Sequence, residues 1–231
     1  MSQTSLNKTA NPTSPWQIYL VVVGVGVTCG TLILAVHEAT RQRITDNRAA
    51  YRDQAAITVL PGAIRVTSFR WDDTGQGMSG HWVADGDRQS PETILAGYDP
   101  AGALVGVAIE AAGRGYQDTI RLIYGYSPTQ QVILGFRILE SRETPGLGDR
   151  VETDSAFVDQ FRGLPVQAID RGNEEPRVEL GGADQQRAWQ VDGISGATVT
   201  SRAVARTIAE SVARWFPRIE ADLSTLREAH L

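Results

Sequence analysis

The chain has 231 residues, with 22 Lys and Arg against 27 Asp and Glu, and a net charge of −5. This length is enough for a membrane anchor and one domain with a substantial core, and the acidic balance argues against a nucleic-acid binder. The single cysteine, Cys29, excludes an internal disulfide, a thiolate-bound iron–sulfur cluster and a cysteine-based zinc site. The three histidines lie far apart in the sequence, so we expect no metal site.

The first predicted element is a membrane-spanning helix. Ile18–Val36 contains no charged side chain and is close to the length needed to cross a bilayer. Trp16 and Tyr19 fit an interfacial aromatic belt at its start. A secretory signal peptide is the alternative, but the apolar run is long, Lys8 is the only charged side chain before it, and no small-residue cleavage site precedes His37. We therefore expect an uncleaved helix.

Two features of this segment concern its surroundings. Gly26 and Gly30 are four residues apart, which places two small positions on one face where another membrane helix can pack. Basic residues are more frequent after the helix than before it, which by the positive-inside rule would place the following domain in the cytoplasm. These residues are Arg41, Arg43, Arg48 and Arg52.

The next part of the chain, residues 38–92, is predicted to be a helical and loop connector. The pattern of Thr40–Leu60 favours a helix that continues from the membrane segment and ends before Pro61. The stretch from Asp72 to Pro91 contains four glycines and is predicted to be rich in loops.

Alternating apolar residues and turn signals then predict an α+β domain with a mostly antiparallel sheet and flanking helices. The predicted strands are Ile94–Tyr98, Leu104–Ala111, Ile120–Tyr126, Gln131–Glu140 and the short Val166–Ile169. The predicted helices are the short Ser155–Phe161, the amphipathic Thr200–Phe216, and a continuation over Ile219–Glu228.

Two glycine-containing loops lie between these elements. Gly113–Tyr116 has a Gly-x-Gly spacing, which is a weak phosphate signal because no helix follows it. Tyr116 fits either packing beside a planar ligand or filling the core. Glu143–Gly148 reads ETPGLG and directly follows the most apolar strand; as a bare pattern it indicates only a tight loop.

The most informative stretch is Asp192–Ser201, which reads DGISGATVTS and opens into a helical pattern. The hydroxyl of Thr198 is able to form a phosphoester, and Gly196 and Ala197 allow a bulky group to approach the backbone. A helix beginning near Thr200 or Ser201 would direct unpaired N–H groups toward a phosphate.

Charged and hydroxyl side chains around this stretch allow two interpretations. Arg202 and Arg206 would add charge-assisted contacts to a phosphate. Judged by spacing alone, however, the hydroxyl residues are helix-capping residues rather than a binding site. They are Ser195, Thr198, Thr200 and Ser201.

Taken together, these features resemble the G subunit of the Rnf (or Rsx) ion-translocating electron transport complex. The resemblance covers nearly the whole chain and rests on the N-terminal membrane helix, the Gly113–Tyr116 loop, the Glu143–Gly148 loop and the Asp192–Ser201 motif. The Glu143–Gly148 loop followed by the Asp192–Ser201 motif is the specific part. The C subunit of the sodium-pumping NADH:quinone reductase shares the same flavin-binding domain and is the alternative; it is usually longer, so the compact length favours the Rnf member.

The resemblance implies a site for FMN. Thr198 matches the threonine that accepts FMN from FAD, as a covalent phosphoester, in a reaction of a separate flavin transferase. Asp192, Ser195, Gly196 and Ala197 match the recognition pattern of that transferase. A loop expected beside the flavin matches Glu143, Thr144, Gly146 and Leu147, and Thr200 is included among the expected cofactor-binding residues.

The same resemblance implies the role and the location of the protein. We expect an electron carrier in ion-coupled transport between ferredoxin and NAD, working with membrane and peripheral subunits of the complex and not turning over a substrate by itself. The implied organisation is a cytoplasmic tail (1–15), a single transmembrane helix (16–37), the connector (38–92) and an FMN-binding domain (93–231) on the periplasmic side of the bacterial inner membrane. On orientation we follow the resemblance against the arginine-rich flank. The remaining alternatives are a flavin-free, membrane-anchored binding domain and a free-standing flavin reductase.

Overall fold

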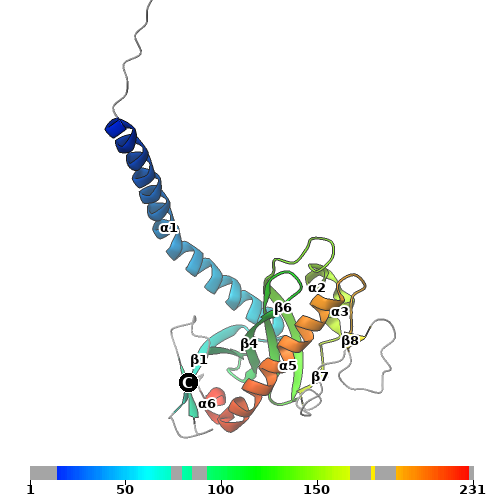
Figure 1. Cartoon of the computed structure of the whole chain (residues 1–231). Helices are drawn as coiled ribbons and strands as arrows, with labels where there is room; N and C mark the ends of the chain where they lie inside the picture. The colour runs from blue at the N-terminus through cyan, green and yellow to red at the C-terminus, as the bar shows by residue number, and fades with distance from the viewer. Residues whose placement is uncertain (1–14, 74–79, 85–92, 167–177, 180–190, 229–231) are drawn as a thin grey trace, which may run out of the picture. The chain divides into compact units, whose positions relative to one another are not determined.

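Residues 15–73, 80–84, 93–166, 178–179 and 191–228 are described by the computed structural model (Figure 1). The chain divides into two compact units, Met1–Arg48 and Ala49–Leu231. Helix α1 (Pro15–Val59) is continuous over 45 residues and contributes to both units. It includes an 18-residue stretch with a mean hydropathy of 2.3, long and apolar enough to cross a membrane. The predicted extension of the membrane helix beyond Val36 is confirmed.

The second unit is built on a seven-stranded sheet in which every neighbouring pair is antiparallel. Its order is β2-β1-β3-β4-β5-β6-β7. The strands are β1 (Arg65–Asp73), β2 (Gly80–Ala84), β3 (Thr93–Tyr98), β4 (Leu104–Arg114), β5 (Thr119–Ser127), β6 (Val132–Glu140) and β7 (Leu164–Pro165). A separate parallel pair joins β8 (Val178–Glu179) to β9 (Val191–Asp192). The predicted fold class and the four central strands are confirmed.

Strands β1 and β2 correct the predicted loop-rich stretch. They lie inside the range 38–92 that the sequence indicated as a connector of helix and loop, yet both join the sheet. Apolar and polar residues alternate only weakly in these strands, because charged and small residues interrupt the pattern. The two strands are held together by the cross-strand pair Trp71 and Trp82, whose rings meet edge to face with their centroids 5.0 Å apart. Trp82 also stacks on Trp215 at 6.0 Å. Residues 74–79 and 85–91 lie outside the described residues.

The helices that follow differ from their predictions in their bounds. The predicted helix Ser155–Phe161 is present as α3 (Ser155–Asp159), preceded by α2 (Arg150–Thr153). The predicted strand Val166–Ile169 is wrong in its first residue, because β7 ends at Pro165; residues 167–169 lie outside the described residues.

The long C-terminal helix also starts and ends elsewhere than predicted. Helix α5 (Thr198–Ala221) begins two residues earlier than Thr200 and runs through Pro217. Of the predicted continuation Ile219–Glu228, the first residues therefore belong to α5, and the separate helix is α6 (Leu223–Glu228). A proline is tolerated near the end of α5 because Ala213, whose carbonyl loses its hydrogen-bond donor, is solvent-exposed.

Helix α5 covers one face of the sheet (Figure 1). Its apolar residues pack on β4 and β5, as Val204, Ile208 and Val212 do beside Ile109 and Tyr124. The Tyr124 hydroxyl lies 2.9 Å from the Ser211 hydroxyl, so this buried polar pair is satisfied. This packing fixes the position of α5, and with it the helix end that carries the Asp192–Ser201 motif.

The last turns of α1 that belong to the second unit cover the other face. Ala55, Ala56 and Val59 are buried there together with Leu60. The approach is so close that a Cβ on Gly125 of β5 would lie 2.1 Å from the Val59 carbonyl oxygen. Only glycine permits this backbone separation, which explains an otherwise unfavourable residue in a central strand.

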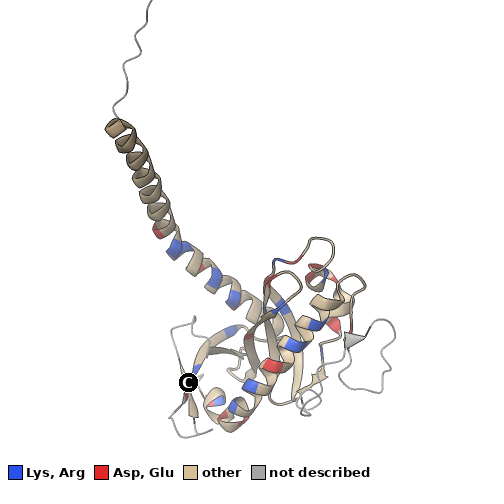
Figure 2. Ribbon diagram, in the orientation of Figure 1, with Lys and Arg blue, Asp and Glu red and all other residues tan. Residues whose placement is uncertain are grey.

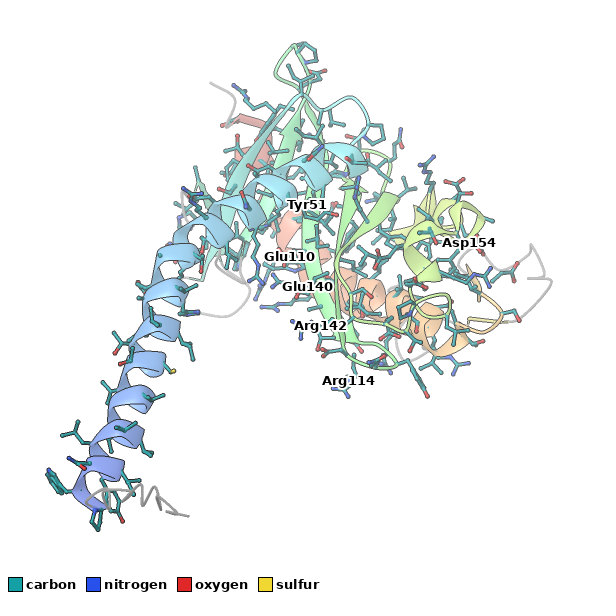
Figure 3. The ribbon with its side chains drawn as sticks, turned by 90° about the horizontal axis from the view of Figure 1, so that it is seen from above. Tyr51, Glu110, Arg114, Glu140, Arg142 and Asp154 are labelled. Atoms are coloured by element: carbon teal, nitrogen blue, oxygen red, sulfur yellow. The ribbon has the colours of Figure 1, made fainter. Side chains whose placement is uncertain are left out.

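Charged residues continue along this second face (Figure 3). Arg52 of α1 lies 3.2 Å from the Glu110 carboxylate, which also binds Arg121. Further along, Arg142 lies within 3.8 Å of Glu140 and, through a second nitrogen, 3.7 Å from Asp118. The series of ion pairs extends from the end of α1 to the loop that joins β4 to β5.

Candidate functional site

The three loops singled out by the sequence meet at the carboxylate of Glu143. This side chain follows β6 and is only 6% exposed. Its Oε1 accepts hydrogen bonds from the backbone N–H groups of Gln117 (2.9 Å) and Asp118 (3.4 Å), in the loop between β4 and β5. Its Oε2 accepts from the Thr200 hydroxyl of α5 at 2.7 Å. One buried group therefore joins segments that are far apart in the sequence.

The hydrogen bonds to Glu143 determine its charge state. Burial acts to raise the pKa of this carboxyl group. The bonds from the Thr200 hydroxyl and from three backbone N–H groups of residues 116–118 outweigh burial and hold the pKa below its usual value. The carboxylate is therefore ionised at neutral pH, and among the described residues its negative charge is matched by hydroxyl and N–H donors.

Two glycines make room for this carboxylate. A Cβ on Gly115 would lie 2.5 Å from Oε1, and a Cβ on Gly148 would lie 2.6 Å from Oε2. A side chain at either position would collide with the Glu143 carboxylate. Gly115 and Gly148 therefore allow their two loops to pack closely against this carboxylate. Gly113 belongs to the same group, because its Cβ would meet Thr207 Oγ1 of α5 at 1.9 Å.

The start of α5 forms the second part of the site. Ala197 occupies the N-cap position and is 4% exposed, and no side chain caps the helix. The capping interpretation of the hydroxyl residues is therefore wrong. Thr200 donates to Glu143, while Ser201 donates to the Ala197 carbonyl and accepts from the Ile194 N–H.

Thr198 is the first residue of α5 and is half-buried. No described residue forms a hydrogen bond with its hydroxyl. In the same turn, by contrast, the hydroxyls of Thr200 and Ser201 both donate hydrogen bonds within the protein. The N–H groups of the first helical turn have no acceptor within the helix and no side-chain cap, so they are oriented toward any anion bound there.

The segment before Thr198 is a folded turn. Gly196 has φ = +84°, a conformation that glycine adopts without strain, and Ala197 N–H donates to the Ile194 carbonyl at 2.9 Å. The Ser195 side chain is exposed, and its carbonyl oxygen accepts from Arg150 Nη1 at 3.1 Å. At the other end, the backbone of Asp192 is held through both its N–H (2.6 Å) and its carbonyl by the Gln160 amide.

The Glu143–Gly148 loop borders this turn. Leu147 is 50% exposed, and its Cδ2 would lie 3.4 Å from a Cβ on Gly196. Thr144 is half-buried and donates to the Gln117 side chain at 3.1 Å, while Gly146 is exposed with φ = +77°. All the predicted site residues thus lie in two contacting loops and one helix turn.

Sequence reasoning missed several residues that support the site. Gln160, Arg150 and Gln117 hold the loops together through side chains that belong to no motif, so the sequence carries no signal for them. Of the two arginines expected to approach a phosphate, Arg202 is exposed one turn after Thr198, whereas Arg206 lies two turns along and pairs with Glu210 at 3.9 Å. Figure 2 shows both basic and acidic positions along α5.

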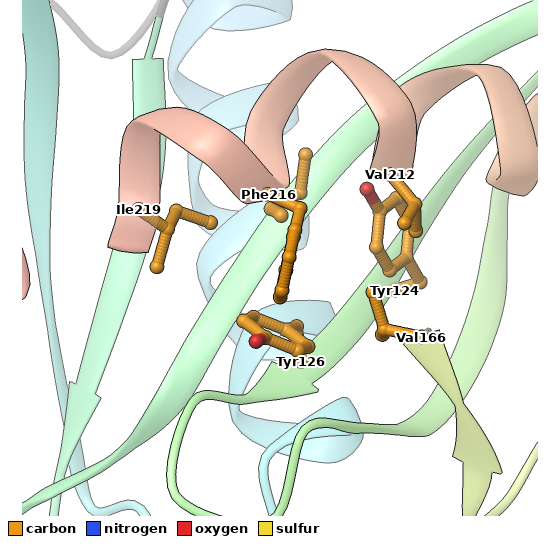
Figure 4. Close-up of a pocket in the computed structure, with 7 residues that line it drawn as sticks. Tyr124, Tyr126, Val166, Val212, Phe216 and Ile219 are labelled. Atoms are coloured by element: carbon orange, nitrogen blue, oxygen red, sulfur yellow. The ribbon is translucent and has the colours of Figure 1, made fainter. Parts of the chain in front are cut away.

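The cavity between α5 and the sheet is too small for a flavin (Figure 4). Its volume is about 10 Å³, the space of a single water molecule, and its lining is largely apolar. The lining residues are Ile109, Tyr124, Tyr126, Val166, Val212, Phe216 and Ile219. A group as large as FMN does not fit this cavity.

Comparison with known proteins shows the family of the chain. Residues 115–213 match the FMN-binding domain family. The chain is 38% identical over 192 residues to the G subunit of an ion-translocating oxidoreductase complex from Shewanella baltica, which covers 81% of this chain and 82% of that one. The corresponding protein from Methanosarcina acetivorans is 28% identical over 199 residues, with coverage of 85% and 92%.

Solved structures show the same fold. The C subunit of the Na⁺-translocating NADH-quinone reductase from Parabacteroides distasonis superimposes with a TM-score of 0.57 at 17% identity, covering 78% of this chain and 96% of that one. NqrC from Shewanella oneidensis gives a TM-score of 0.54 at 20% identity, with coverage of 79% and 98%.

Proposed function

The chain belongs to the G-subunit family of ion-translocating oxidoreductase complexes, and from this premise we propose that it carries electrons on an FMN joined to Thr198 by a phosphoester bond. The observation that supports this most directly is the start of α5. There an unengaged threonine hydroxyl stands at the first helical position, beside N–H groups that no side chain caps.

This arrangement fits the phosphate of FMN. A phosphodiester keeps one negative charge, which the first-turn N–H groups and the positive end of the α5 dipole stabilise. Arg150, already 3.1 Å from the Ser195 carbonyl, and Arg202, one turn after Thr198, supply positive charge nearby. The exposed Gly196 leaves room for the attached group to extend away from the turn.

The attachment reaction requires a separate flavin transferase with FAD as the donor. The Thr198 oxygen forms a bond to the FMN-side phosphorus, the pyrophosphate bond breaks, AMP leaves with the bonding electrons, and the hydroxyl proton is lost to solvent. Once bound, the flavin ring accepts and donates electrons. The residues of the chain hold it in place and set its surroundings.

The family and the predicted anchor support the wider role that we propose. Helix α1 attaches the protein to a membrane, which confines the carrier to the neighbourhood of its partner subunits. We place the second unit on the periplasmic side and assign the protein to electron transfer between subunits in ion-coupled transport between ferredoxin and NAD. A Cβ added at Gly26 or Gly30 would meet no described residue within 4 Å apart from the local helix backbone, so these positions offer a face for a partner membrane helix.

The test is the mass of the tryptic peptide Ala188–Arg202, from full-length protein purified from its native membrane. We expect an increase equal to FMN less one water, absent in Thr198→Val and retained in Thr153→Val, which removes an exposed hydroxyl from α2. An unmodified wild-type peptide from cells that contain the transferase would refute covalent attachment. If the protein is also colourless, the flavin-free binding domain is correct; NADH oxidation by the purified protein alone would indicate a free-standing reductase.

A further inference from the structure

We propose that Glu143 is a positioning residue of the flavin site and not a flavin ligand: its carboxylate locks the first turn of α5, and with it Thr198, against the two neighbouring loops. This inference rests on the proposed attachment of FMN to Thr198.

Both carboxylate oxygens are already used within the protein. Oε1 accepts from the N–H groups of Gln117 and Asp118, and Oε2 accepts from Thr200 at 2.7 Å. With only 6% of the residue exposed and glycines packed on either side, no edge of the carboxylate is presented to a ligand at the surface. A direct hydrogen bond from Glu143 to the flavin would require breaking one of these contacts.

The contact to Thr200 replaces a missing helix cap. The first turn of a helix has unpaired N–H groups and frays unless something fixes it, and α5 has no side-chain cap. Thr200 is 1% exposed, lies two residues after Thr198, and is bound to a group outside the helix. The Glu143–Thr200 bond therefore fixes this turn to the end of β6 and to the loop between β4 and β5.

The consequence concerns the attached flavin. A phosphoester contains several single bonds, so the position of the ring depends on how firmly the threonine itself is held. Electron transfer between subunits requires the flavin to return to the same place relative to its partners. Loosening the first turn of α5 is therefore expected to increase the local motion of the flavin before it affects the rest of the fold.

The experiment compares flavin-loaded, full-length variants in detergent by time-resolved fluorescence anisotropy of the flavin. Thr200→Val keeps the shape of the side chain and removes the donor, whereas Thr200→Ser keeps the donor. The matched control is Thr207→Val: the same change in the same helix, at a buried hydroxyl whose hydrogen bond within the described part of the chain goes to the Ala203 carbonyl of α5 itself. Glu143→Gln tests the other partner with its shape retained.

We expect the share of fast anisotropy decay to rise at least about twofold in Thr200→Val and Glu143→Gln, and to remain at the wild-type value in Thr200→Ser and Thr207→Val. Loss of bound FMN from both Thr200→Val and Glu143→Gln, with unchanged unfolding midpoints, would support the same conclusion. The proposal is wrong if Thr200→Val lowers the unfolding midpoint but leaves the decay unchanged, because the bond would then serve stability only. Wild-type protein without FMN on Thr198 would instead refute the proposed function.

Discussion

Gly113→Ala is the sharpest test of how α5 is seated on the sheet. The new Cβ would lie 1.9 Å from Thr207 Oγ1, 3.0 Å from its Cβ and 3.3 Å from its Cγ2, all closer than an ordinary contact. Thr207 is 5% exposed and donates to the Ala203 carbonyl at 2.7 Å. To relieve the overlap, either Thr207 rotates and loses this bond, or α5 moves away from β4.

The structure sets the expected magnitudes. Overpacking a filled site costs about 1–3 kcal/mol, and the very short 1.9 Å contact places Gly113→Ala at the upper end. Thr207→Ala alone loses one buried hydrogen bond, about 0.5–1.5 kcal/mol. The double variant removes Oγ1 and Cγ2, leaving only the 3.0 Å Cβ contact. It should therefore be more stable than Gly113→Ala, with a coupling energy of about 1–2 kcal/mol.

The assay is thermal unfolding of the full-length protein in detergent, followed by tryptophan fluorescence. A change of 1 kcal/mol corresponds to about 2–4 °C for a domain of this size. Strict additivity of the two substitutions would refute the packing argument. If the Gly-x-Gly spacing instead served a phosphate, Gly113→Ala would lower the FMN content without changing the unfolding midpoint, and Thr207→Ala would not restore it.

Three further predictions follow from single contacts. Gly125→Ala should cost about 3 kcal/mol or more in urea unfolding, because its Cβ would lie 2.1 Å from the Val59 carbonyl oxygen, a backbone atom that no side-chain substitution removes. Folding lowers the pKa of Glu143, so its ionised carboxylate stabilises the folded protein. This stabilisation is complete above the usual glutamate pKa of about 4.3 and is lost as the pH falls through the lower folded-state pKa. Glu143→Gln should therefore flatten this part of the profile of stability against pH. Glu110→Ala should cost about 1.5–3 kcal/mol in urea unfolding and be nearly insensitive to salt, because it removes the carboxylate that binds both Arg121 and Arg52, whose side chain is 11% exposed; the control is Glu228→Ala, at an exposed position in α6.

The parts of the fold that the sequence predicted are those with regular periodicity. Helix α5 has apolar residues at helical spacing because one of its faces packs in the core, and strands β3–β6 have alternating or continuous apolar runs because α5 covers one face of the sheet and the end of α1 the other. Strands β1 and β2 lack such a run, and their order depends on the pairing of Trp71 with Trp82 across the two strands. A contact between two side chains eleven residues apart has no local pattern to reveal it.

The site was predicted as a set of residues but not as an arrangement. The motifs identified the Thr198 turn and the Glu143–Gly148 loop, yet gave Glu143 the same expected role as Leu147. The structure separates them: Glu143 is 6% exposed and fully hydrogen-bonded, whereas Leu147 is 50% exposed beside Gly196. A glutamate in a loop sequence carries no sign of which way its carboxylate points, since that depends on donors supplied by other segments.

The meeting of the three loops nevertheless follows from the topology. In an antiparallel sheet the end of one strand lies beside the start of the next. The turn after β4 and the end of β6 therefore lie at the same end of the strands, where the register pairs Arg114 with Thr119 and Arg121 with Glu140. Helix α5 packs along β4 with its first turn at this end of the strands, because Gly113 lies against Thr207 and Thr200 donates to Glu143. Given the order β4-β5-β6 and the close approach of α5 at Gly113, both the loop between β4 and β5 and the first turn of α5 place hydrogen-bond donors near Glu143. The carboxylate that locks Thr198 in place is thus a consequence of strand order, and a single glycine in β4 sets how closely the helix can approach it.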